Sequence, residues 1–288
     1  MKIFIFFISF VFFWSCRPEP LTIDLPTYKE RIVVSSQIVP TTTMVVGLTN
    51  SFTVLSQSSI NGELDSTFFR SLLIDSALVT IKYGSNLDTL VKIAPGVFGS
   101  NTTPQNVKQE YQLYVYDYKT NQEVSASSIM LPQVKFDQVS ATKDVVDGKT
   151  IVKLDYSFTD PTNEQNYYMI NVFTQNSILD GLDVNSYFDR GENKLIKTIA
   201  LSDFEFDEAK VKGKLLLDEI QANDTLAVTL SNISKQYYGY LLQRERASED
   251  ILSQISNEPI NYNTNVTNGL GFFNTHNPDI RLFFVSEL

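Results

Sequence analysis

The chain has 288 residues, a formal net charge of −10 and 43% hydrophobic residues, which is enough for two domains of ordinary size. The acidic balance and the lack of a basic cluster exclude a nucleic-acid-binding protein. The single cysteine and single histidine exclude an intrachain disulfide and a metal site built from several histidines.

The N-terminus is a predicted signal peptide. Lys2 supplies a positive charge, and an apolar run broken only by Ser9 follows from Ile3 to Trp14. This run is shorter than the roughly 20 apolar residues that a membrane-spanning helix requires. Residues 1–15 are therefore expected to be removed on export.

The only cysteine, Cys16, comes directly after the small residue Ser15. A small residue followed by Cys at this place resembles the bacterial lipobox, in which the thiol receives a diacylglyceryl group. The alternative is an unmodified thiol, which is unusual in an exported protein. We predict lipidation at Cys16, with the proline-rich residues 16–29 as an extended tether. The mature protein would then be anchored to a membrane without spanning it.

Period-2 alternation predicts strands in the first predicted domain, residues 30–131. In chain order they are "ERIVVSSQIV", "TTMVVGL", "ALVTIKY", "LDTLVKI" and "EYQLYVYDY". Pro132 interrupts the pattern in "IMLPQVKF", where we place the boundary with a second domain, residues 132–288.

The second domain opens with the cleanest alternation, "IVKLDYSFTD", which places Val152, Leu154, Tyr156 and Phe158 on one face. Asp160-Pro161 ends this strand, and "NYYMINVFT" is its predicted partner. Further strands are predicted at residues 194–200, 214–220, 226–230 and 280–285.

One segment has helical spacing instead. Between residues 234 and 255, apolar side chains recur every three or four positions, at Tyr237, Tyr238, Leu241, Leu242, Ile251, Leu252 and Ile255. Together these patterns predict an all-β fold of two β-sandwich domains, with one amphipathic helix packed on a sheet of the second.

Several segments in order, "ERIVVSSQIVP", "EYQLYVYD", "FTDPTNEQNYYMI", "SDFEFDEAKVKG", "SKQYYGYL" and "NEPINYNTNVTNGLGFF", resemble a lipoprotein family, domain of unknown function (DUF) family 4249. The resemblance implies an outer-membrane lipoprotein of the Bacteroidetes group, often encoded beside a TonB-dependent transporter. It also implies two β-domains, the first Ig- or transthyretin-like, and no enzymatic activity.

Two polar features invite a chemical role. His276 could act as a base only alone in a loop beside Pro278, so a turn residue is the favoured interpretation. The acidic "SDFEFDE" could bind calcium, but it lacks the glycine and terminal glutamate of an EF-hand loop. A capped helical turn, with Ser202 as N-cap and Glu205 completing a capping box, is favoured over a calcium site.

Two aromatic features remain. Tyr114, Tyr116 and Tyr118 share one strand face, where they could contact a ligand or a partner, or be covered by a neighbouring part of the chain. "NGLGFF" has no lysine or following helix for a phosphate loop, so a tight turn into a core strand is favoured.

No pairing of nucleophile and base is evident, so we expect no enzyme, no cofactor and no metal site. The predicted function is binding, as an outer-membrane lipoprotein that faces the cell exterior and assists a TonB-dependent β-barrel transporter in nutrient uptake. The alternative is a structural accessory subunit of an outer-membrane protein assembly or export complex.

Overall fold

The computed structural model describes residues 29–39, 43–52, 66–161, 165–175, 194–206, 209–249 and 262–288. The predicted signal peptide, the lipidation site Cys16 and all but the last residue of the tether lie outside these ranges. None of the helices within them is long and apolar enough to cross a membrane.

The fold is all-β, as predicted, with strands that form four sheets in the described ranges. The strands are β1 (Ile32–Val39), β2 (Thr43–Asn50), β3 (Ala77–Tyr83), β4 (Asn86–Thr89), β5 (Val91–Ala94), β6 (Val97–Ser100), β7 (Glu110–Asp117), β8 (Gln122–Ile129), β9 (Phe136–Val146), β10 (Lys149–Thr159), β11 (Tyr167–Gln175), β12 (Lys194–Ser202), β13 (Lys210–Ile220), β14 (Thr225–Ile233), β15 (Leu270–Phe272) and β16 (Asp279–Phe284). The other elements are the helices α2 (Ser66–Leu72) and α4 (Lys235–Glu249) and the 3₁₀ turns η3 (Asp203–Glu205) and η4 (Val285–Glu287).

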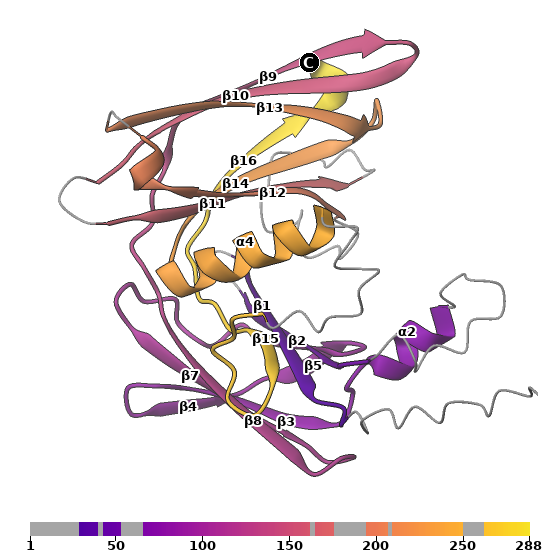
Figure 1. Cartoon of the computed structure of the whole chain (residues 1–288), viewed down its shortest axis with the longest axis vertical. Helices are drawn as coiled ribbons and strands as arrows, with labels where there is room; N and C mark the ends of the chain where they lie inside the picture. The colour runs from indigo at the N-terminus through magenta and orange to yellow at the C-terminus, as the bar shows by residue number, and fades with distance from the viewer. Residues whose placement is uncertain are drawn as a thin grey trace, which may run out of the picture.

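The first lobe, in the lower half of Figure 1, consists of the sheets β15-β1-β2-β6-β5 and β4-β3-β7-β8. Alternate residues of both sheets, such as Val46 on β2 and Val115 on β7, meet in one apolar core. Sheet faces that bury every second side chain against each other are the basis of a sandwich. The alternation in the sequence therefore predicted the core face correctly.

The single strand expected for "LDTLVKI" is in fact two strands in different sheets. β4 pairs with β3, whereas β5 pairs with β6 in the facing sheet. Leu90 lies between them, is buried, and donates its backbone N–H to the carbonyl of Val79 at 2.9 Å. The chain changes sheets at this residue because its side chain enters the core between the two layers.

A segment near the C-terminus belongs to the first lobe. β15 pairs with β1 in parallel, with Gly271 opposite Val34, and Phe273 is fully buried in the first core. The division at residue 132 stays a prediction, but the first lobe is not one continuous stretch of chain. Residues of the predicted second domain complete one of its sheets.

The second lobe, in the upper half of Figure 1, packs the sheet β13-β10-β9 against β12-β11-β14-β16. The predicted core face of β10 is confirmed, since Val152, Leu154, Tyr156 and Phe158 are all buried. The predicted pairing of this strand with β11 is wrong. β10 pairs with β9 and β13, whereas β11 pairs with β12 and β14.

The loop after β10 explains this error. Proline lacks a backbone donor and ends the ladder at Pro161. Asp160 donates its N–H to the carbonyl of Ala209 at 2.7 Å, and Tyr168 donates its hydroxyl to the carboxylate of Asp160. The chain thus crosses from one sheet to the other, and β10 and β11 face each other across the core.

The predicted helix is confirmed as α4, which packs on β11 and β12. Ser234 caps its first turn by accepting the N–H of Tyr237 at 3.2 Å, as an N-cap serine does. Ile251, Leu252 and Ile255, the last apolar positions of the prediction, lie outside the described residues. Helix α2, in the first lobe, was not predicted.

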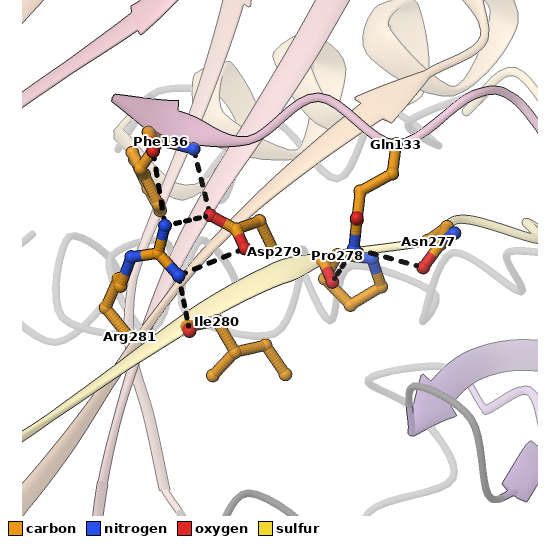
Figure 2. A network of polar contacts seen from close by, with 7 residues as sticks. All are labelled: Gln133, Phe136, Asn277, Pro278, Asp279, Ile280 and Arg281. Carbon is orange, nitrogen blue, oxygen red and sulfur yellow. Dashed lines mark hydrogen bonds and ion pairs between the residues drawn. The ribbon is translucent and has the colours of Figure 1, made fainter. Parts of the chain in front are cut away.

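Two connections between the lobes run side by side, residues 131–135 and residues 277–278 (Figure 2). Gln133 donates its side-chain amide to the carbonyl of Pro278 at 2.9 Å. Next to it, the carboxylate of Asp279 accepts the N–H of Phe136 at 2.9 Å and pairs with Arg281 at 3.1 Å. The bonds of Gln133 and Phe136 join chain segments that are more than 140 positions apart.

Candidate functional site

The tyrosine stripe, Tyr114, Tyr116 and Tyr118, lies on the outer face of β7 and the turn after it. Its neighbours Tyr111, Leu113 and Val115 are buried, so the predicted alternation of faces is confirmed. Tyr114 is 38% exposed and Tyr118 is 57% exposed. In the described part of the chain, no strand or lobe covers these two rings.

Hydrogen bonds fix the orientation of the stripe. The hydroxyl of Tyr114 donates to Glu123 at 2.9 Å, and that bond raises the pKa of the phenol. The hydroxyl of Tyr116 donates to Asn121 at 2.8 Å, and its ring meets that of Tyr118 edge-on at 5.4 Å. A rigid aromatic surface loses little conformational entropy on binding, which suits a contact surface.

A shallow groove begins beside Tyr114 on the outer face of the sheet β4-β3-β7-β8. This sheet groove has a volume of about 550 Å³ and is lined mostly by polar side chains, including Thr80, Gln112 and Ser125. Opposite residues of adjacent strands share a face, and Tyr114 lies between Thr80 and Ser125 in the ladder. The small side chains of Thr80 and Ser125 leave open space on either side of the large Tyr114 ring, and this space is part of the groove.

A second hollow, of about 510 Å³, lies between the lobes. This interlobe crevice is lined by the end of β8, the starts of β11 and α4, and the end of β14. Tyr167 and Phe272, both buried, supply aromatic surface, while Asn232 and Gln236 supply amides. Sequence reasoning did not find this crevice, because its walls come from segments far apart in the chain.

The acidic "SDFEFDE" forms the 3₁₀ turn η3 instead of an α-helical turn. Ser202 caps it as predicted, accepting the N–H of Phe204. Glu205 accepts the hydroxyl of Tyr238 from α4 at 3.1 Å, so it ties the turn to the helix. Asp207 and Glu208 lie outside the described residues.

"NGLGFF" forms the tight turn and core strand that were predicted. Asn268 and Gly271 have positive φ angles of 63° and 83°, and β15 leads to the buried Phe273. Asn265, in the same segment, accepts the N–H of Phe273 at 2.9 Å and donates to the carbonyl of Ser127 at 2.9 Å. Asn265 thereby lines both hollows.

His276 lies in the irregular stretch after β15, but it is buried and not an exposed turn residue. Its Nδ1 accepts the side-chain amide of Asn274 at 3.0 Å, which corresponds to a neutral ring. Burial lowers the pKa of His276 from 6.5 to about 4. Within the described ranges no acidic group pairs with this neutral, buried ring, so we assign it a structural role.

This burial predicts a pH-dependent stability. Below pH 6.5 the unfolded chain binds a proton at His276, while the folded chain binds it only near pH 4, so acid favours unfolding across that window. Between pH 7.5 and 5.5 we expect the free energy of unfolding to fall by about 1.3 kcal/mol. Urea unfolding at both pH values measures it.

The variant His276→Gln is the control, because glutamine cannot bind the proton. Its unfolding free energy should be the same at both pH values, whatever its absolute stability. Equal pH dependence in the variant and the parent protein would contradict the assignment to His276, the only histidine of the chain.

The sequence model of a family described as "Domain of unknown function (DUF4249)" matches residues 18–280. The chain belongs to the DUF4249 family. This match covers both lobes and includes the segments that form the sheet groove and the interlobe crevice. A search among curated proteins finds no match to this DUF4249 protein.

Two solved structures show remote likenesses to the DUF4249 chain. Three N-terminal domains of the highly immunogenic outer capsid protein of bacteriophage RB49 align at 14% identity and a TM-score of 0.22, over 72% of this chain and 64% of that one. A mutant Salmonella alpha-2-macroglobulin aligns at 9% identity and a TM-score of 0.23, over 94% of this chain and 16% of that one. This chain thus spans less than two thirds of either protein, and scores this low carry no argument about function.

Metal binding has no support in the described ranges of the DUF4249 protein. No three His, Cys, Asp or Glu side chains come together there in a way that could hold an ion. The groups that remain for chemistry in the two hollows are amides, hydroxyls, aromatic rings and isolated charges. Such a lining can bind a ligand through hydrogen bonds and stacking.

Proposed function

We propose that this DUF4249 protein is a lipid-anchored binding protein of the outer membrane that assists a TonB-dependent transporter in nutrient uptake. The observation that carries the proposal is the tyrosine stripe, in which Tyr114 and Tyr118 are exposed and Tyr114 borders a polar groove. Neither the stripe nor the groove contains a pairing of nucleophile and base, so the proposed activity is binding without chemistry.

The proposed anchor makes weak contacts effective. A lipid on Cys16 and a short proline-rich tether would keep the body within tens of ångströms of the bilayer. Confinement to that layer raises the effective concentration toward other outer-membrane proteins. A modest interface would then be occupied for most of the time.

Tyr118 is the best candidate for a partner contact. It is 57% exposed, and its ring is braced edge-on by Tyr116. Tyrosine is enriched among the residues that dominate binding energy at interfaces, because it combines large apolar area with a polar tip. The stripe would therefore anchor the partner, with charges such as Glu123 at its rim.

Co-purification tests the proposal. Gentle detergent extraction of the native lipoprotein should recover a large outer-membrane β-barrel with it, and Tyr118→Ala should weaken that complex about tenfold. Phe204→Ala is the matched control, because Phe204 is an even more exposed aromatic residue on the other lobe. Cys16→Ala should abolish fatty-acid labelling and reduce recovery of the barrel by removing the anchor.

Moderate salt should weaken the complex only in part, since aromatic burial would hold it more than rim charges. Recovery of the lipoprotein as a monomer, with surface crosslinking to no barrel, would overturn the transporter role. Crosslinking to components of a protein-assembly complex would instead support the alternative function, a structural accessory subunit of such a complex.

A further inference from the structure

We infer that the sheet groove and the interlobe crevice form one binding site for a chain of neutral, hydroxyl-rich sugar units. The inference rests on the proposed binding role and names the ligand class for it. The two hollows share Glu110, Ser127 and Asn265 in their linings, so they meet at the start of β7 and the end of β8. A ligand long enough to pass this junction would contact both lobes.

The site offers many polar groups that have no partner. The side chains of Gln112, Gln165, Asn232 and Gln236 line the two hollows and make no hydrogen bond within the described ranges. Each amide has both donors and an acceptor, which is the combination that sugar hydroxyls can satisfy. These amides occur on both lobes and along both hollows.

Asn232 points most directly to a ligand. It is only 7% exposed at the end of β14, yet its side chain is unpaired in the described part of the chain. The side-chain amide of Asn232 is not among the fully buried, unpaired polar atoms of the described residues, so it reaches the open space of the crevice. A ligand hydroxyl in the crevice could therefore form hydrogen bonds with it in place of water.

Aromatic side chains line both hollows. Tyr114, 38% exposed, borders the sheet groove, and its hydroxyl bond to Glu123 fixes the ring in place. Tyr167 and Phe272 line the crevice, but both rings are largely buried. An exposed ring beside a polar groove suits a ligand whose units each present one apolar C–H face, as sugar rings do.

An extended peptide fits this site less well. Peptides that bind along a sheet use the free backbone groups of an edge strand. Here the edge of β8 is already occupied, because Ser125 forms a bridge with Thr267 and the carbonyl of Ser127 accepts the amide of Asn265. Recognition in the groove therefore depends on side chains.

An anionic ligand also fits less well. The carboxylate of Glu110 lies at the junction of the two hollows, and the whole chain has a net charge of −10. The lysines in the lining, Lys82 and Lys235, belong to different hollows. Repulsion at the junction favours a ligand without charge.

The test is calorimetric titration of the full-length lipoprotein, in a detergent without a sugar headgroup, with length series of neutral glucan, mannan and xylan oligosaccharides. At least one series should bind with an affinity that rises with chain length and then levels off. Ser127→Tyr, which blocks the junction, should weaken binding of the longest ligand at least about tenfold. Tyr114→Ala should weaken it as well.

Thr142→Tyr is the matched control, because it adds the same bulk to an exposed strand position on the second lobe. It should bind as the parent protein does. Three results would overturn the inference. The first is an unchanged oligosaccharide affinity in Ser127→Tyr. The others are binding of a peptide length series but of no oligosaccharide, and binding of neither. Recovery of the outer-membrane barrel with Ser127→Tyr is measured separately, so failure of the sugar site is distinguishable from failure of the transporter role.

Discussion

The variant Gly271→Ala is expected to lose at least about 3 kcal/mol of unfolding free energy. Gly271 has a φ angle of 83°, which side-chain-bearing residues rarely adopt. A Cβ atom there would also lie 2.0 Å from the carbonyl oxygen of Val34, a backbone atom of the partner strand. The parallel pairing of β1 and β15 would have to open to make room.

Urea unfolding of Gly271→Ala measures this loss, and Gly148→Ala is the matched control. Gly148 has a similar φ angle of 77°, but no atom lies within 4 Å of the position of its Cβ. Backbone strain alone should cost the control about 1–2 kcal/mol. Equal losses in the two variants would show that close packing against Val34 contributes nothing.

The second large effect is expected for Asp279→Ala, at about 3 kcal/mol of unfolding free energy. The carboxylate accepts the N–H of Phe136 and pairs with Arg281, and its side chain is only 10% exposed (Figure 2). Its removal leaves a buried backbone donor without an acceptor and a guanidinium group without its counter-charge. Both groups lie where the chain passes between the lobes.

Denaturant unfolding of Asp279→Ala and Asp155→Ala in parallel checks this. Asp155 forms an ion pair of similar length with Lys214, but the two side chains are 50% and 85% exposed. Exposed pairs contribute little, so the control should lose under about 1 kcal/mol. Asp279→Asn, which can still accept the N–H of Phe136, should fall between the two. Similar losses of unfolding free energy in Asp279→Ala and Asp155→Ala would show that burial does not make the Asp279 contacts stronger than an exposed ion pair.

Local patterns predicted many of the strands and the helix α4, but not helix α2. The alternation along β10 and β7 identified the buried face of each strand, because neighbouring side chains in a strand point to opposite sides whatever the fold. Three- and four-residue spacing located α4, and the glycines of "NGLGFF" indicated a turn before a core strand. The same alternation placed the tyrosine stripe on an outer face.

Pairing between distant segments was decided only by the tertiary structure. Nothing near Asp160 in the sequence shows that the next strand joins the facing sheet, and nothing near Leu90 shows that one apolar run is divided between two sheets. Likewise, β15 pairs with β1 across more than 230 residues. Such choices depend on which partner buries the most apolar surface, and that depends on the whole chain.

The candidate site shows the same division. The sequence by itself identified Tyr114, Tyr116 and Tyr118 as a possible contact surface, because strand periodicity is a local property. It gave no indication of the groove beside Tyr114 or of the crevice, whose walls come from β8, β14, α4 and the segment around Asn265. It also left His276 as a turn residue, because burial depends on the segments that pack over a side chain. A hollow between lobes exists only once distant segments have packed, so its lining has no signature in any one stretch of sequence.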